Sequence, residues 1–82
     1  METRIAVISI VVENLDRVEE INRLLHEFGP YIIGRMGIPY RQKGISIISI
    51  AMDAPGDIIS ALSGKLGMLP GITTKTVYAR TK

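Results

Sequence analysis

The residues with the clearest capacity for chemistry lie in the stretch HEFGPYIIGRMGIPYRQKG, residues 26–44. Gly34 and Gly37 interrupt its apolar sequence and expose backbone, which allows a ligand or a neighbouring chain to approach closely. Guanidinium and ammonium groups beside such backbone can pair with a carboxylate or a phosphate. Three basic residues supply these groups: Arg35, Arg41 and Lys43.

This arrangement predicts a binding site for a small anionic ligand or a protein partner. The predicted site consists of Gly34, Arg35, Met36, Gly37, Tyr40 and Arg41. An alternative stays open, because the two glycines can equally mark a β-bulge or close packing between subunits. In that alternative the charges only solvate a strand edge and its turn, which agrees with the lack of a phosphate-loop pattern.

A metal site or a catalytic centre is not predicted. His26 is the single histidine and the chain has no cysteine, so a zinc or nickel site would need further ligands from another subunit. In the last turn of a helix, His26 is instead expected to interact favourably with the helix dipole. The carboxylates show no pair set apart for acid–base work. We therefore expect no metal, no cofactor and no enzyme activity.

The composition is typical of one small packed domain, which we expect to span residues 1–82. Apolar residues make up 46% of the chain, which argues against disorder. The net charge of +2 is too small to indicate nucleic-acid binding, which usually requires a basic stripe. The apolar run IAVISIVV is far shorter than the roughly 20 residues of a membrane span. We expect a cytoplasmic protein without a membrane or nucleic-acid partner.

Two helices and four strands are expected to position these residues. Apolar side chains recur at helical spacing over residues 15–28, and Gly29 occupies the position of a left-handed C-cap. A second helix begins in DAPGD, with Asp53 as its cap, and Gly67 closes it. The expected strands are residues 4–13, 31–39, 45–52 and 72–80.

The two halves of the chain resemble each other at a constant offset. ISIVVE from Ile8 matches ISIAMD from Ile48, and Pro30 matches Pro70, both at an offset of 40 residues. Two βαβ units in one sheet explain this repeat, and right-handed crossovers place both helices on the same face. The predicted fold is α+β, a ferredoxin-like βαββαβ sandwich with a four-stranded antiparallel sheet and two helices on one face.

A ferredoxin-like fold raises the possibility of RNA recognition, and the third strand tests it. RNA-recognition motifs carry aromatic residues there, on which bases stack. The corresponding segment, KGISIISI, has isoleucine at each of those positions. The sequence therefore argues against RNA binding of this kind.

The face of the sheet opposite the helices is predicted to be apolar as well. Because side chains alternate along a strand, Val7 and Val11 point away from Ile8, while Ile45 and Ile47 point away from Ile48. Burying one such side chain is worth roughly 1.5–3 kcal/mol, so an uncovered face would be a large adhesive patch. We predict that Val7, Val11, Ile45 and Ile47 mediate self-association, most simply as a two-fold dimer. The alternative is a monomer with a tolerated apolar surface.

Two motifs, YIIGRMGIPY and GKLGMLPG, are quite specific, and with LLHEFGP and GISIISI they carry a resemblance over essentially the whole chain. The chain resembles the iron-only hydrogenase system regulators, a family of small ACT-like proteins. The resemblance implies a ferredoxin-like fold similar to the C-terminal domain of nickel-responsive regulators. It also implies a regulatory role, associated with hydrogenase maturation genes and without an established chemistry.

The ligand sites of these related proteins do not carry over residue by residue. The nickel site uses several histidines and a cysteine, whereas this chain has one histidine and no cysteine. ACT domains often bind amino acids near the turn between the first strand and the first helix. Here that turn is ENLD, residues 13–16, and it lacks the Pro-Gly often found there.

The leading hypothesis is a non-catalytic oligomeric regulatory module that binds a small ligand or a protein partner at its subunit interfaces. A first alternative is a purely structural or protein-interaction subunit without a ligand. A second alternative is a metal-responsive regulator, for which His26 is the sole candidate ligand that is not a carboxylate.

Overall fold

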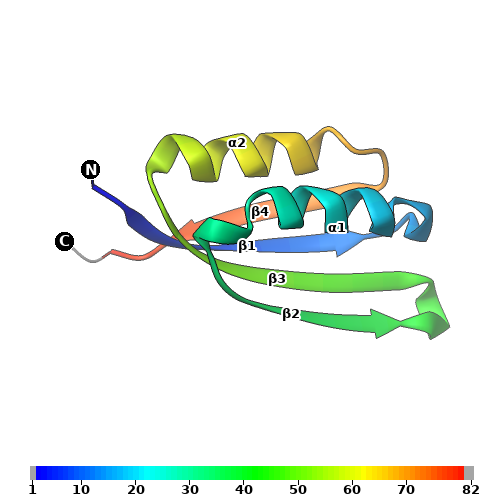
Figure 1. The fold of residues 1–82 in the computed structure, drawn as a ribbon. Coiled ribbons are helices and arrows are strands. Elements are labelled where there is room, and N and C mark those ends of the chain that lie inside the picture. Colours follow the sequence, from blue (N-terminus) through cyan, green and yellow to red (C-terminus); the bar gives the residue numbers. More distant parts are fainter. Residues whose placement is uncertain (1, 81–82) are drawn as a thin grey trace.

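The computed structural model describes residues 2–80, which form a four-stranded antiparallel sheet with two helices on one face (Figure 1). The sheet order is β2-β3-β1-β4, so β2 and β4 are its edges. The regular elements are β1 (Arg4–Val12), α1 (Val18–Glu27), β2 (Ile32–Tyr40), β3 (Ile45–Ala54), α2 (Gly56–Gly67) and β4 (Ile72–Tyr78). Three 3-10 turns join them: η1 (Leu15–Arg17), η2 (Gly29–Tyr31) and η3 (Arg41–Lys43). The predicted ferredoxin-like βαββαβ fold is confirmed.

The internal repeat of the sequence corresponds to a structural repeat. The central strands β1 and β3 each lead into a helix, and the edge strands β2 and β4 begin at Ile32 and Ile72, 40 residues apart. Both helices then cover the same face of the sheet, as right-handed crossovers require (Figure 1).

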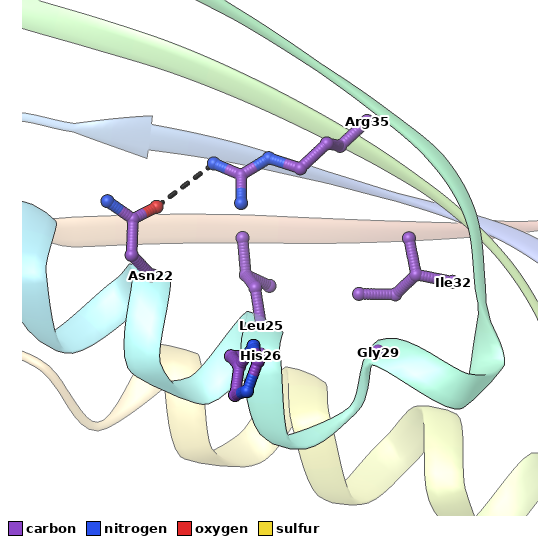
Figure 2. Close-up of a pocket in the computed structure, with 6 residues that line it drawn as sticks. All are labelled: Asn22, Leu25, His26, Gly29, Ile32 and Arg35. Carbon is purple, nitrogen blue, oxygen red and sulfur yellow. Dashed lines mark hydrogen bonds between the residues drawn. The ribbon is translucent and has the colours of Figure 1, made fainter.

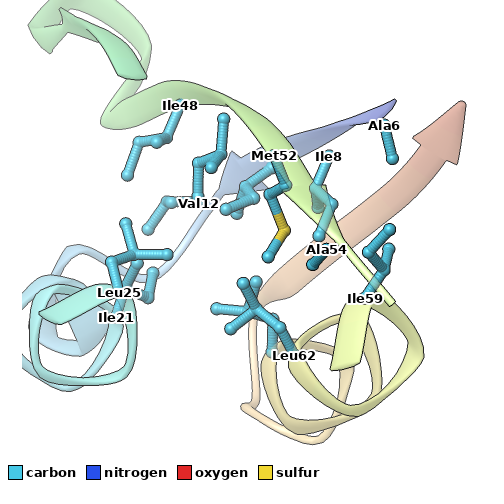
Figure 3. Close-up of a cluster of buried hydrophobic side chains, with 13 residues drawn as sticks. Ala6, Ile8, Val12, Ile21, Leu25, Ile48, Met52, Ala54, Ile59 and Leu62 are labelled. Atoms are coloured by element: carbon cyan, nitrogen blue, oxygen red, sulfur yellow. The ribbon is translucent and has the colours of Figure 1, made fainter. Parts of the chain in front are cut away.

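The hydrophobic core lies between the helices and the covered face of the sheet (Figure 3). Every second residue of β1 and β3 points into it, because side chains alternate along a strand. Each large side chain buried there contributes roughly 1.5–3 kcal/mol. The core residues are Ala6, Ile8, Ile10, Val12, Ile21, Leu25, Ile48, Ile50, Met52, Ala54, Ile59, Leu62 and Leu66.

The predicted cap of the first helix is wrong. Gly29 does not adopt the left-handed conformation, which within residues 2–80 is found at Gly44 and Gly71. Instead the chain continues into η2, where the N–H of Tyr31 donates to the carbonyl of Phe28 at 3.0 Å. Because this 3-10 bond satisfies a terminal carbonyl of the helix, a left-handed residue is not needed.

The predicted cap of the second helix is also wrong. Asp53 is still part of β3, and α2 begins only at Gly56, after Pro55. The carbonyl of Pro55 accepts hydrogen bonds from the N–H groups of Ile58 and Ile59, at 3.0 and 3.2 Å. The fixed φ of proline suits this position just outside the helix. At Pro55 no side chain forms a capping hydrogen bond.

Gly71 closes the loop between α2 and β4 by a close backbone approach. Its φ is 76°, and a Cβ added to it would lie 2.6 Å from the Cβ of Asn14. Its carbonyl accepts the N–H of Glu13 at 2.8 Å, while the side chain of Asn14 accepts the N–H of Asp16 at 3.1 Å. Only glycine combines this φ with this proximity, which ties the start of β4 to the end of β1.

Among residues 2–80, neither α1 nor α2 is long and apolar enough to cross a membrane.

Candidate functional site

The edge strand β2 contains an irregularity that decides where its side chains point. Ile32 pairs with Met52 and Gly34 pairs with Ala51, so Ile33 is an extra residue opposite a single step of β3. Such a bulge shifts the alternation of all the side chains that follow it. Beyond the bulge, Arg35 pairs with Ile50, a core residue, and therefore points to the helix-covered face.

Alternation along β2 divides the predicted binding residues between the two sides of the sheet, and the bulge before them decides which group faces the helices. Directly paired residues of an antiparallel sheet point to the same face. Arg35 and Gly37 therefore lie on the helix-covered face, whereas Gly34, Met36 and Tyr40 lie on the opposite face. Arg41 belongs to neither group, because it begins η3 at the end of the strand and is exposed. Gly34, Met36 and Tyr40 thus share one face of the sheet, while the side chain of Arg35 points to the other.

On the helix-covered side, Arg35 extends over a cleft between α1 and β2 (Figure 2). The cleft has a volume of about 310 Å³. Its lining residues are Asn22, Leu25, His26, Gly29, Ile32 and Arg35. Nη2 of Arg35 donates a hydrogen bond to Oδ1 of Asn22 at 3.0 Å, which holds the guanidinium across the opening.

The cleft joins two residues that the sequence singled out separately, Arg35 and His26. His26 lies in the last turn of α1, as predicted, one turn beyond Asn22 on the same side of the helix. Asn22 itself was not among the predicted site residues. Its spacing of four residues from His26 is the sequence signal that could have pointed to it.

The cleft is polar on one side and apolar on the other. Arg35, Asn22 and His26 supply nitrogen atoms, while Leu25 and Ile32 supply carbon. Among residues 2–80, those that line the cleft include no carboxylate. Within the same residues, histidine, aspartate and glutamate side chains nowhere gather in a group of three that could hold a metal ion.

The second candidate surface is the face of the sheet away from the helices, here called the open face. Side chains on it include Ile47, which is 44% exposed, whereas its neighbour Ile48 in the core is 4% exposed. Three rows of paired residues cross it: Gly34, Ala51, Val7 and Val77; Met36, Ser49, Ser9 and Lys75; and Ile38, Ile47, Val11 and Thr73. Tyr40 and Ile45 add a further pair. The predicted residues Val7, Val11, Ile45 and Ile47 all lie on this face.

The open face is hollowed where its residues are small. A shallow depression of about 250 Å³ lies near Gly34 and Ala51, with Val7, Arg35, Met36 and Ser49 around it. A Cβ added to Gly34 would meet no described atom within 4 Å. This glycine therefore leaves open space on the surface and is not required by packing within the chain.

The chain can be assigned to a known protein family. Its residues 4–76 match the TM1266-like family, described as "Iron-only hydrogenase system regulator, putative". The chain belongs to this family. The resemblance carried by YIIGRMGIPY and GKLGMLPG is confirmed. The family is described by a regulatory role rather than by a reaction.

Solved structures agree with this membership in the TM1266-like family. The uncharacterized protein TM1266 from Thermotoga maritima is 38% identical, with a TM-score of 0.92 over 96% of this chain and 100% of that chain. A formyltetrahydrofolate deformylase from Pseudomonas putida KT2440 is 14% identical, with a TM-score of 0.68 over 95% of this chain and 30% of that one. The latter likeness concerns the fold alone. No curated protein sequence matches the chain.

Proposed function

We propose that this protein is a non-catalytic regulatory module of an iron-only hydrogenase system. It acts as a homodimer or a higher oligomer joined through the open face, and it binds a small ligand or a protein partner at its subunit interfaces. Membership in the TM1266-like family supports the regulatory part of this proposal. The apolar open face carries the oligomeric part.

The open face supports self-association because it resembles a core surface without a cover. Ile38, Ile47 and Val11 form a continuous apolar row across three strands. Of the residues in the three rows, Lys75 carries the charge, and it lies on the edge strand β4. The two central strands contribute the small hydroxyl groups of Ser9 and Ser49 between the apolar rows, so the centre is uncharged and the charge lies at the margin, as is typical of protein interfaces.

The size of the open face suits a second copy of the chain. Strands lie about 4.8 Å apart and rise about 3.3 Å per residue, so four strands present roughly 500 Å² in projection. Side chains add relief to this area, and stable interfaces bury about 600 Å² or more on each partner. A two-fold dimer would therefore cover most of the face.

Sedimentation velocity tests this assembly, at protein concentrations from about 1 to about 100 µM. The unchanged protein is expected to sediment as a dimer at the upper concentrations. Ile47→Lys is expected to give a monomer, because it places a charge at the centre of the interface. Ser60→Lys is the matched control, since Ser60 is an exposed residue of α2, away from the open face.

A monomer throughout that range would contradict the proposed assembly, as would a dimer that survives Ile47→Lys. Native mass spectrometry of protein purified from cells tests the ligand-binding part. A bound small molecule is the expected result, and its absence would favour a purely structural subunit.

A further inference from the structure

We propose that the cleft between α1 and β2 binds a small organic acid, with its carboxylate on Arg35 and Asn22 and its short apolar part against Leu25 and Ile32 (Figure 2). This inference rests on the regulatory part of the proposed function, because it names the class of ligand that the module would sense, and it places that ligand in a cleft within one chain instead of at a subunit interface. The cleft lies on the opposite side of the sheet from the open face, so the two can be tested separately.

The guanidinium of Arg35 is positioned but not neutralised. Within residues 2–80 its side-chain partner is the neutral amide of Asn22, through a single bond from Nη2. An arginine side chain carries five N–H donors in a planar fork, so the remaining donors suffice for a carboxylate bound through both of its oxygens. Because Asn22 holds the guanidinium in place beforehand, less side-chain freedom is lost when the ligand binds.

Asn22 and His26 add donors on the same side of the cleft. The amide oxygen of Asn22 is used by Arg35, which leaves its amide nitrogen as a donor. His26, four residues further along α1, presents an imidazole to the same space. Three nitrogen-bearing side chains therefore surround a volume whose lining, within the described residues, contains no carboxylate.

The apolar side of the cleft indicates more than a simple anion. Leu25 belongs to the hydrophobic core, and Ile32 packs against that core where β2 begins. A volume of about 310 Å³ is at the small end of ligand pockets. A carboxylate with a chain of a few carbon atoms uses both halves of such a cleft, whereas inorganic phosphate uses only the polar half.

The C-terminal end of α1 disfavours the binding of an anion, so one residue must contribute most of the affinity. The C-terminus of a helix carries a partial negative charge. The carbonyls of Leu24 and Phe28 already accept the N–H groups of Phe28 and Tyr31, at 3.1 and 3.0 Å. The full positive charge of Arg35 is therefore required, and its removal is expected to cost more affinity than the removal of either other side chain.

Two-dimensional NMR of the nitrogen-labelled full chain is the test, with sodium butyrate as the probe. Butyrate is expected to shift the amide signals of Asn22, His26, Gly29 and Arg35 at concentrations up to about 50 mM, a weak-binding range for a ligand of this size. Butyramide has nearly the same shape without the charge, and inorganic phosphate has the charge without the tail. Each is expected to bind at least about tenfold more weakly than butyrate.

Arg35→Gln is expected to weaken butyrate binding by about tenfold or more, whereas Arg23→Gln leaves it unchanged. Arg23 is the matched control because it is an exposed arginine of α1 that does not line the cleft. Asn22→Asp provides a second variant. It keeps the shape of the cleft but supplies a carboxylate to Arg35 from within the chain, so it is also expected to exclude butyrate.

Several outcomes would overturn the inference. These are no amide shifts with butyrate, equal binding of phosphate or butyramide, and undiminished binding by both Arg35→Gln and Asn22→Asp. Butyrate binding by the Ile47→Lys protein separates this inference from the proposed assembly. If the unchanged protein stays a monomer but still binds butyrate, only the assembly is contradicted. A dimer that does not bind butyrate contradicts the cleft alone.

Discussion

The two faces of the sheet are built from nearly the same residues but have different surroundings. On the covered face, Ile48 and Ile50 pack against the two helices and are almost fully buried. On the open face, Ile47 and Val7 belong to the same strands and are 44% and 38% exposed. The two helices of the same chain cover the first of these faces. Nothing within residues 2–80 covers the other face.

This difference shows that hydrophobic alternation identifies apolar faces without saying what covers them. A strand that is apolar on both sides is typical of a sheet buried on both faces. Here the helices suffice for one side, and the proposed self-association would cover the second side. The predictions below separate what each face contributes, beginning with the largest expected effect.

The strongest test compares two neighbouring isoleucines of β3. Ile48→Ala is expected to lower the free energy of unfolding by about 2–5 kcal/mol, because it leaves a cavity in the core. Ile47→Ala is expected to cost less than about 1 kcal/mol in dilute protein, where the open face is free. Urea denaturation measures both. The loss of free energy of unfolding caused by Ile47→Ala should grow with protein concentration. Equal losses for the two variants in dilute solution would contradict the proposed difference between the faces.

Two glycines extend the comparison from side chains to backbone. Gly71→Ala is expected to destabilise the fold by about 2–3 kcal/mol, because alanine would adopt φ of 76° against Asn14. Gly34→Ala is the matched control and should change the free energy of unfolding by less than about 1 kcal/mol, since its Cβ would enter open space. Thermal unfolding followed by circular dichroism measures both. A tolerant Gly71 would show that the loop can move away from Asn14.

The smallest effect on stability, and the most specific for assembly, is expected from filling the depression at Gly34. Gly34→Leu should leave unfolding of the dilute protein nearly unchanged. It should weaken self-association by about tenfold, because interface centres pack as tightly as interiors and a partner side chain would occupy this space. Sedimentation equilibrium gives the dissociation constant. An unchanged constant would place the depression outside the interface.

The sequence was sufficient to predict the fold and the two apolar faces, because both follow from short-range regularities. Alternation along β3 assigned Ile47 and Ile48 to opposite faces, and the structure agrees. The 40-residue offset between Pro30 and Pro70 anticipated edge strands that begin 40 residues apart. These signals depend on spacing along the chain and not on how distant segments pack.

Alternation along β2 separates Arg35 from Met36, but the sequence could not show which of them faces the helices, because that depends on one extra residue. Ile33 forms a bulge before both, so Arg35 points to the helices while Met36 points to the open face. A bulge was considered at the glycines, but its register is set by pairing with β3, which a single sequence does not reveal. The contact between Asn22 and Arg35 follows from that register and from the packing of α1 beside β2, so it too was hidden.

The edge strand β2 also limits how large an assembly of this chain can grow. An exposed strand edge invites further strands to add on, and repeated addition produces fibres. In β2, Pro39 lacks an N–H to donate, and the bulge at Ile33 breaks the regular edge, so lateral addition is hindered. In the proposed two-fold dimer, pairing through the open face would use that face on both copies. A concentrated solution of this protein is therefore expected to contain closed assemblies rather than fibres.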